Sequence, residues 1–312
     1  MGSDQPPQAI FDAVFQMHQD LGSSVHFVVI ATDPYYTQLQ KSYDLPIEWV
    51  LAEEYIEMDE LPLAAVRKKK NSSMAVGIRL LGEGKIDAFV STGNTGALVA
   101  TSVVHLPPLS GIERPALLVM LPTGQHKVAV LDVGAHIAPK PSQLLEFARL
   151  GSAYVRSSDL SLSPRIGLLN IGEEEQKGTP IFQESYQLLQ DYFKESFLGN
   201  IEGREVFQGK IDVLVTDGFT GNVFLKTSEG VLSFLVSYLY KQFSTKKEVV
   251  EVISHLYKEF NYSEQPGAIL CGVEGIVVKC HGHSDTTALM NGIRGAIDLA
   301  QREIIKKMKT YL

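Results

Sequence analysis

Short apolar segments alternate with helical periods along almost the whole chain, and no other feature of the sequence restricts the fold as strongly. The apolar segments are continuous rather than alternating, which is typical of strands covered on both faces of a sheet. The clearest of them are residues 25–31, 86–90, 116–121, 128–133 and 213–216. Between them lie segments with apolar residues at helical spacing, including 9–21, 61–81, 141–155, 181–193 and 286–309. This order predicts a doubly wound α/β fold with a mostly parallel sheet and right-handed crossovers.

Composition narrows the class of protein further. The chain has 312 residues, of which 45% are hydrophobic and 21% charged, and it contains no low-complexity linker or internal repeat. We therefore expect a single domain over residues 1–312, built as one body or as two intimately packed lobes. The net charge of −8 argues against a general nucleic-acid-binding protein, which usually carries a positive surplus. Two cysteines, Cys271 and Cys280, are too few for a disulfide framework or a four-ligand zinc site.

Signals for export and for membrane insertion are not evident. The amino-terminal residues are polar and do not resemble a signal peptide. The longest strongly apolar stretch, residues 231–239, is far shorter than the roughly 20 residues of a membrane-spanning helix. We therefore expect a cytoplasmic protein.

Two glycine-rich junctions between a strand and a helix are the most distinctive segments for chemistry. They are S-T-G-N-T-G-A at 91–97 and T-D-G-F-T-G-N at 216–222. Glycines let the backbone approach a ligand, and the free amides of a helix's first turn attract anions. The predicted phosphate-binding residues are Gly93, Asn94, Thr95 and Gly96 in the first loop and Thr216, Asp217, Gly218, Thr220 and Gly221 in the second. The alternative is that both loops are ordinary helix caps with turn glycines.

The standard nucleotide and hydrolase signatures do not occur. The chain has no G-x-G-x-x-G, no G-x-x-x-x-G-K-[ST] and no G-x-S-x-G. Nothing therefore indicates a nicotinamide cofactor, a P-loop or a serine-hydrolase elbow, and we expect no cofactor.

A third polar segment, N-I-G-E-E-E-Q-K-G at 170–178, follows another predicted strand. Its Lys177, next to a glycine, is a candidate for a movable cation over a bound phosphate. The alternative is a solvated loop lysine.

The H-G-H-S-D segment at 281–285 has the alternating histidines of some metallohydrolases, but Thr286 replaces the usual third histidine. Ser284 or Asp285 suits the N-cap of the last helix, so we predict no metal site there.

Two surface features suggest partners. Arg67, Lys68, Lys69 and Lys70 form a dense basic run, which is either a solvated helix face or a patch that steers an acidic partner. Residues 221–243 and 246–260 predict a helical hairpin whose apolar surface is broadened by aromatic residues. We expect it to serve core packing or dimerisation, with contact between its apolar tip and a membrane surface as a secondary hypothesis.

These segments together resemble the bacterial fatty acyl-acyl carrier protein:phosphate acyltransferase family. The resemblance rests on MGSDQPP at 1–7, RKKKNSSM at 67–74, STGNTGAL at 91–98, LDVGAH at 131–136, SPRIGLLNIGEE at 163–174, DVLVTDGFTGNVFLKTSEG at 212–230 and KCHGHSD at 279–285. The segment VTDGFTGNV at 215–223 is the most specific of these. The chain departs from the family pattern in two places. An apolar strand is expected ahead of the turn at 1–7, and His136 stands where the resemblance suggests asparagine.

The resemblance implies a fold similar to phosphotransacetylases and to the isocitrate and isopropylmalate dehydrogenases, with two lobes around a cleft, a protruding helical hairpin and a homodimer. It also implies that inorganic phosphate attacks the thioester of a long-chain acyl-acyl carrier protein, giving acyl phosphate for phospholipid synthesis. Asn222 and the amides of the turn at 218–221 would stabilise the oxyanion, and Lys177 would neutralise phosphate. Residues 67–70 would dock the acidic carrier protein, and no metal would be required.

Two other functions remain open at this point. An enzyme of the phosphotransacetylase type would use acyl-coenzyme A as the donor. A non-catalytic scaffold would bind a carrier protein or a membrane without turnover.

Overall fold

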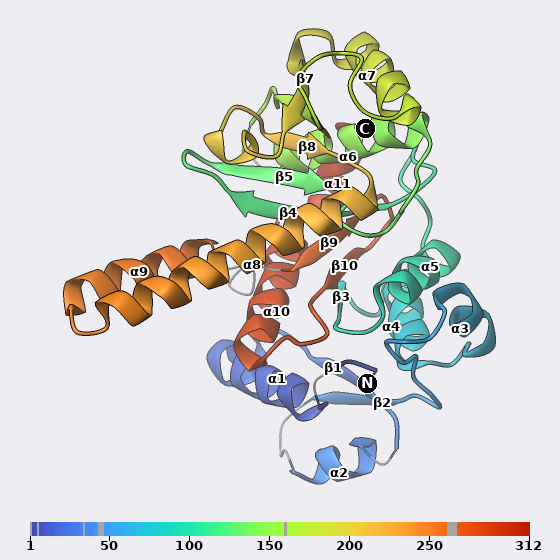
Figure 1. Ribbon diagram of the computed structural model, residues 1–312. Coiled ribbons are helices and arrows are strands. Elements are labelled where there is room, and N and C mark those ends of the chain that lie inside the picture. The colour runs from blue at the N-terminus through green and yellow to red at the C-terminus, as the bar shows by residue number, and fades with distance from the viewer. Residues whose placement is uncertain (1, 5, 34, 43–46, 159–160, 261–266) are drawn as a thin grey trace. The chain divides into compact units, whose positions relative to one another are not determined.

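The computed structural model describes residues 2–4, 6–33, 35–42, 47–158, 161–260 and 267–312. The chain divides into two compact units (Figure 1): Met1–Leu109 with Gln265–Ile305, and Ser110–Glu264 with Lys306–Leu312. Each unit combines short strands with helices, and most strand pairs are parallel. The expected α/β class is thus confirmed.

The first unit contains two groups of strands. β1 (Val28–Ala31) pairs in parallel with β2 (Glu48–Leu51). β3 (Ala88–Ser91) pairs in parallel with β10 (Ile276–Lys279), which also pairs antiparallel with β9 (Ala268–Cys271). The helices of this unit are α1 (Gln8–Leu21), α2 (Tyr35–Ser42), α3 (Pro62–Lys68), α4 (Ser73–Gly82), α5 (Thr95–His105) and α10 (Thr286–Gln301).

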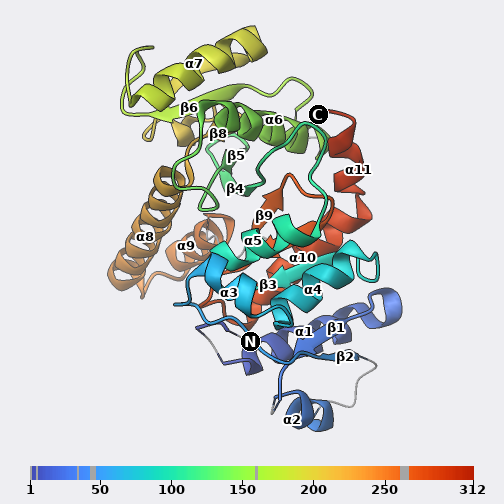
Figure 2. The same cartoon turned by 90° about the vertical axis from the view of Figure 1, so that its right-hand side faces the viewer.

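The core beside β1 comes from the apolar stripe of α1. Phe11, Val14 and Met17 recur at helical spacing and are buried against Phe27 and Val29. The Phe11 ring stacks on Trp49 with 5.6 Å between ring centroids, which joins α1 to β2. Figure 2 shows α1, β1 and β2 gathered in this part of the unit.

The second unit contains five strands in the order β4-β5-β8-β6-β7. β4 and β5 form an antiparallel pair, and the other neighbours are parallel. Val128 to Leu131 are fully buried, as expected for a strand covered on both faces. The elements are β4 (Ala116–Pro122), β5 (Lys127–Leu131), α6 (Pro141–Ser157), β6 (Ile166–Asn170), α7 (Pro180–Phe193), β7 (Phe197–Glu202), β8 (Val213–Val215), α8 (Gly218–Phe243) and α9 (Lys247–Phe260).

Two predicted helices are broken, which corrects the sequence-based assignment. The segment 61–81 divides into α3 and α4 because Ser72 starts a new helix, its hydroxyl accepting a hydrogen bond from the Ala75 amide at 3.3 Å. The segment 286–309 divides into α10 and α11 (Ile304–Lys309) at Glu303, which adopts a left-handed φ of 51°. The sequence pattern did not predict α2 or β7.

The expected helical hairpin is present in the second unit as α8 and α9, which pack against each other (Figure 1). Beyond the first turns of α8, its exposed large apolar side chains are Val231, Phe234, Leu235 and Tyr238 on α8 and Val252 on α9. Among the described helices, none is long and apolar enough to cross a bilayer.

Candidate active site

The loop at 216–222 joins β8 to the long helix α8 and is tightly bonded within itself. The Asp217 carboxylate caps the helix by accepting hydrogen bonds from the Thr220 amide at 2.8 Å and the Thr220 hydroxyl at 2.7 Å. The Gly218 amide donates to the His136 carbonyl at 2.8 Å. The Gly221 amide donates to the Asp217 carbonyl at 2.8 Å and the Thr216 amide to the Leu131 carbonyl at 2.9 Å. The Thr220 side chain and at least four of the loop amides therefore already have acceptors inside the protein.

Glycine is required in this loop because α8 begins against residues 132–136. A Cβ on Gly221 would lie 2.0 Å from the Asp132 carbonyl oxygen, and one on Gly218 would lie 2.8 Å from the Asp132 carboxylate. Any larger residue would push the start of α8 away from this segment. The glycines thus serve close backbone packing, and the amide-lined turn that they create is the element that the phosphate hypothesis needs.

Asp132 binds the backbone of the segment at 132–136, against which α8 begins. It was not among the predicted site residues. Its carboxylate is fully buried and accepts hydrogen bonds from the amides of Leu117, Gly134, Ala135 and His136 at 2.7–3.2 Å. A buried carboxylate with this many donors holds its loop in one conformation. Its sequence signals are its place directly after a fully apolar strand and within the LDVGAH segment at 131–136.

Two polar atoms beside this corner remain without hydrogen-bond partners among the described residues. They are Thr216 Oγ1 and His136 Nδ1, both buried. Thr216 is completely buried at the point where the chain enters α8. A ligand oxygen at this helix terminus would give the Thr216 hydroxyl an acceptor and would gain from the helix dipole.

Asn222 lies on the first turns of α8, and its side chain is exposed. Its Cβ is 4.0 Å from the point that a Cβ on Gly134 would occupy, so Asn222 borders the segment that Asp132 holds. The neighbouring Phe219 and Val223 are also exposed, at 62% and 52%. The start of α8 therefore presents an amide side chain between two apolar ones.

The loop at 91–97 in the first unit is built on a similar plan. Asn94 caps α5, its Oδ1 accepting from the Ala97 amide at 3.0 Å, while its Nδ2 donates to the carbonyls of Met58 and Glu60 at 3.0 and 3.1 Å. The Asn94 side chain is thus buried and committed to the fold. The amides of Thr95 and Gly96 are in the first helical turn and have no intrahelical acceptor.

Lys279 is a buried cation beside this loop, and the sequence analysis assigned it no role. It ends β10, is 8% exposed, and directs Nζ towards the carbonyl oxygens of Thr92 and Cys280. The carboxyl ends of β3 and β10 and the start of α5 therefore meet around one ammonium group.

The two cysteines are unsuited to nucleophilic chemistry. Burial raises the pKa of Cys271 to about 12. Burial also raises the pKa of Cys280 to about 11, although the nearby charge of Lys279 acts in the opposite direction. Neither thiol is ionised at neutral pH.

Lys177 lies in the loop after β6 in the second unit. Its side chain is 48% exposed, and Nζ is 3.7 Å from the carboxylate of Glu174. The loop itself is anchored, because Asn170 donates to the Lys177 carbonyl at 3.1 Å and Asn200 donates to the Glu174 carbonyl at 2.8 Å. No hydrogen bond or ion pair joins Lys177 to residues 216–222 within the described part of the chain.

The segment 281–285 adopts the cap that the sequence predicted. Asp285 accepts a hydrogen bond from the Ala288 amide at 2.8 Å and starts α10. His283 Nδ1 lies 3.1 Å from the carboxylate of Asp4. The described residues contain no group of three His, Cys, Asp or Glu side chains placed to hold a metal ion.

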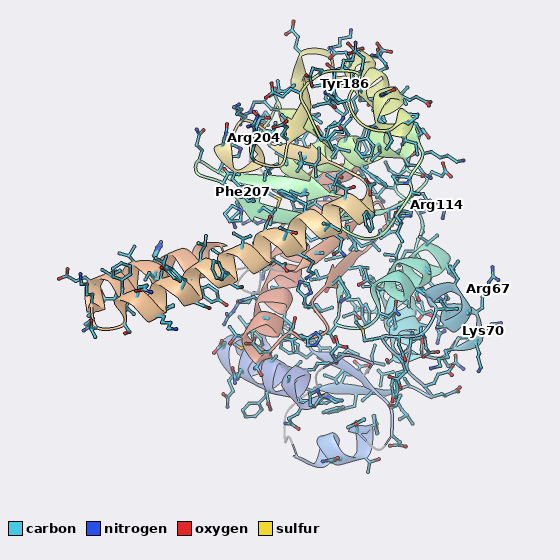
Figure 3. All side chains as sticks on the ribbon, in the orientation of Figure 1. Arg67, Lys70, Arg114, Tyr186, Arg204 and Phe207 are labelled. Carbon is cyan, nitrogen blue, oxygen red and sulfur yellow. The ribbon has the colours of Figure 1, made fainter. Side chains whose placement is uncertain are left out.

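The basic run at 67–70 is divided by the structure. Arg67 and Lys68 are exposed at the C-terminal end of α3, and Lys70 is exposed just beyond it. Figure 3 labels Arg67 and Lys70. Leu61 and Leu63, at the start of the same helix, are 77% and 66% exposed. Lys69 is instead half-buried in an ion pair with Glu60 and donates to the Tyr55 carbonyl at 2.8 Å. Three of the four cations are therefore available to a partner.

Comparison with solved structures defines the class of fold. A phosphotransacetylase from Streptococcus pyogenes matches 94% of this chain and 91% of its own, with a TM-score of 0.62 and 16% sequence identity. The EutD phosphotransacetylase from Staphylococcus aureus matches 95% of this chain and 92% of its own, with a TM-score of 0.58 and 17% identity. The chain thus has the fold of the phosphotransacetylases.

Sequence comparison identifies the family within that fold. Residues 1–307 match the family described as "Fatty acid synthesis protein". A phosphate acyltransferase from Chlamydia caviae is 42% identical over 317 residues, covering 100% of this chain and 97% of the relative. A phosphate acyltransferase from Chlamydia pneumoniae is 42% identical over 320 residues, with the same coverage. The chain belongs to the phosphate acyltransferase family, as the sequence motifs indicated.

Proposed function

We propose that this protein transfers a long-chain acyl group from an acyl-acyl carrier protein to inorganic phosphate, producing acyl phosphate for phospholipid synthesis. The observation that carries the proposal is 42% identity over the whole chain to proteins named phosphate acyltransferase. The Thr216 hydroxyl at the start of α8, which has no partner within the described part of the chain, supports a phosphate site in the second unit.

The reaction requires little activation of the nucleophile. A phosphate oxygen attacks the thioester carbonyl, the C–S bond breaks, and the thiolate of the carrier leaves and takes up a proton. Phosphate is already anionic, so the protein's task is to hold and aim it, which can contribute about 7–11 kcal/mol. The loops at 91–97 and 216–222 are the proposed phosphate sites, and Asn222 is the proposed donor to the oxyanion of the tetrahedral intermediate.

Two cations are candidates for balancing the phosphate charge. Lys177 is only loosely paired with Glu174, so its ammonium is free to move towards a ligand. Lys279 is fixed at the edge of the 91–97 loop. Because the structure assigns the two loops to different units, we propose Lys177 for the second-unit loop and Lys279 for the first-unit loop.

The exposed end of α3 is the proposed docking surface for the carrier protein. Acyl carrier proteins are acidic as a class, and Arg67, Lys68 and Lys70 supply complementary charge at the end of a helix whose start carries exposed Leu61 and Leu63. Lys69 is excluded from this surface because Glu60 already holds it.

The hairpin of α8 and α9 is the proposed site of self-association. Its exposed Val231, Phe234, Leu235 and Tyr238 form an apolar stripe that a second copy of the chain would cover. Peripheral contact with a membrane is the alternative role of the same stripe, and a cytoplasmic location agrees with both.

The test is phosphate-dependent consumption of palmitoyl-acyl carrier protein by the purified protein with a chelator present, with palmitoyl-coenzyme A measured in parallel. Turnover of the carrier-protein thioester supports the proposal. Turnover of the coenzyme A ester alone would assign the protein a phosphotransacetylase-type donor. Binding of the carrier protein without turnover would identify a scaffold.

A further inference from the structure

His136 lies in the loop that joins β5 to α6, and this loop is packed against the start of α8. β5 and β8 are parallel neighbours, so the loops that follow them leave the sheet at the same edge. The Asp132 amide donates to the Thr216 carbonyl at 3.0 Å, and the Gly218 amide donates to the His136 carbonyl at 2.8 Å. His136 therefore belongs to the same corner as the Thr216 hydroxyl, which has no partner among the described residues.

The two nitrogens of the His136 ring have different surroundings. Nδ1 is buried and lies 3.6 Å from Oδ2 of Asp132. Nε2 is not buried and has no hydrogen-bond partner within the described part of the chain. The ring is held beside Phe147 of α6, with 5.9 Å between ring centroids, and the side chain is 19% exposed. A ligand can thus reach Nε2, whereas Nδ1 faces the carboxylate.

This arrangement suits a group that takes up and releases a proton. The Asp132 carboxylate only accepts hydrogen bonds, so it favours the neutral tautomer with the hydrogen on Nδ1 and a lone pair on Nε2. A proton added to Nε2 would create an imidazolium beside a buried negative charge, which attracts it. The contact of 3.6 Å is longer than a hydrogen bond, as catalytic contacts often are before the substrate binds.

The other charged groups around this corner are less suited to move a proton. The Asp217 carboxylate already accepts from the Thr220 amide and hydroxyl. Glu146 of α6 accepts from the amides of residues 113 and 114. Lys140, which precedes α6, is exposed. Of these groups and His136, only the histidine combines an open lone pair with a neighbouring carboxylate.

The proposed reaction requires one proton to move from the nucleophile to the leaving group. An oxygen of the hydrogen phosphate dianion forms a C–O bond with the thioester carbon, and the C–S bond breaks with its electron pair going to sulfur. The phosphate hydrogen is then surplus on the acyl phosphate, while the thiolate lacks a proton. Transfer of this proton to sulfur gives the acyl phosphate dianion and a neutral thiol, and no other acid or base is consumed.

We propose that His136 is the proton relay of this reaction. Nε2 takes the proton from bound hydrogen phosphate as the C–O bond forms and gives it to the sulfur as the C–S bond breaks, while Asp132 positions the ring. The inference rests on the proposed function and adds a catalytic residue to it. The chain carries this histidine where the family resemblance suggests asparagine, whose amide cannot take up a proton at neutral pH.

The test is chemical rescue of His136→Ala, assayed as phosphate-dependent consumption of palmitoyl-acyl carrier protein. Imidazole is added to replace the missing ring, and pyrazole, which is nearly the same size but far less basic, is the matched additive. His136→Gln is the second variant, because it keeps a polar side chain that fills the site but cannot relay a proton. His26→Ala is the control, since it removes an exposed histidine that also lies beside a carboxylate, 3.0 Å from Glu48.

We expect kcat to fall about 10²-fold in both His136 variants and to stay unchanged in His26→Ala. Imidazole should restore kcat of His136→Ala about tenfold or more, whereas pyrazole should not, and neither additive should help His136→Gln. Normal turnover by His136→Gln, equal rescue by both additives, or rescue by neither would assign the ring to packing and overturn the relay. A wild-type protein that consumes no thioester would overturn the proposed function itself, and the relay with it.

Discussion

Asp132 holds the backbone of His136 but leaves its imidazole without a hydrogen bond. The His136 amide donates to Asp132 Oδ2 at 2.7 Å, while His136 Nδ1 lies 3.6 Å from the same oxygen, too far for a hydrogen bond. The carboxylate therefore holds the backbone of the loop, while the imidazole lies beside Phe147 of α6, with 5.9 Å between ring centroids. This arrangement would let a buried acidic residue support the proposed anion site without touching the anion.

Asp132→Asn tests that support. The amide keeps only one oxygen acceptor, so some of the loop amides lose their partner, and we expect the free energy of unfolding to fall by about 1.5–3 kcal/mol. Urea unfolding of the variant, with exposed Asp191→Asn as the control, measures this loss. A variant as stable as the control would show that the hydrogen bonds from these four amides contribute little.

Asn222→Ala tests the proposed oxyanion donor. Loss of one such donor typically costs about 2.7–4 kcal/mol, so kcat should fall about 10²–10³-fold. The melting temperature should change little because the Asn222 side chain is exposed. Steady-state kinetics with palmitoyl-acyl carrier protein, with Thr227→Ala on the same helix as the control, provides the measurement. Normal turnover by the folded variant would remove Asn222 from the mechanism.

Lys177→Met tests the proposed mobile cation. The side chain is 48% exposed and only loosely paired, so its loss should leave stability intact and reduce kcat/KM for phosphate about tenfold or more. Glu174→Gln removes the neighbouring carboxylate but keeps the cation, and it should leave kcat/KM equal or raised. If both variants behave like the wild type, Lys177 is a solvated loop residue.

Charge reversal at Arg67 and Lys70 tests the docking surface (Figure 3). The double variant to Glu should raise KM for the acyl-carrier substrate and weaken its dependence on salt, while KM for phosphate stays constant. A double variant of exposed Arg114 and Lys194 to Glu matches the change in net charge. An equal rise of KM in both double variants would indicate a general charge effect and would contradict the proposed docking surface at residues 67–70.

Asp212 makes the stability of the second unit depend on pH. Burial raises the pKa of its carboxyl, but hydrogen bonds and charge from Arg165 outweigh burial and lower the pKa below its ordinary value. The Arg165 guanidinium donates hydrogen bonds to both Asp212 carboxylate oxygens at 3.0 Å, and His126 Nε2 lies 3.0 Å from one of these oxygens. A lowered pKa means that this stabilisation is present above the unfolded pKa and is lost as the pH falls through the folded pKa.

Asp212→Asn should therefore lower the free energy of unfolding at pH 7, and its difference from the wild type should shrink as the pH falls below about 4. Urea unfolding at several pH values, with Asp191→Asn as the exposed control, measures the difference. A difference that stays constant with pH would mean that the variant acts through packing alone.

The sequence predicted the elements whose pattern is strong and local. The buried strands around 116–121 and 128–133 and the helices at 9–21, 141–155 and 181–193 stand close to their expected positions. It did not predict the break at Ser72, because Arg67 to Lys70 continue a helical composition and only the cap of α4 ends it. It missed Asp132, whose importance comes from donors spread over residues 117–136.

The sequence by itself determined the α/β class, the family and the loops that carry the family motifs, because each of these depends on residues that are contiguous in the chain. The tertiary structure decided which side chains of those loops remain available. Thr220 is held by Asp217 and Asn94 by the carbonyls of residues 58 and 60, whereas the Thr216 hydroxyl has no partner among the described residues. It also decided that Lys69 is paired while Arg67 is exposed, and that β1 and β3 each keep an open edge. The physical reason is that these hydrogen bonds, ion pairs and strand pairings form between residues that are far apart in the chain, so no local sequence pattern predicts them.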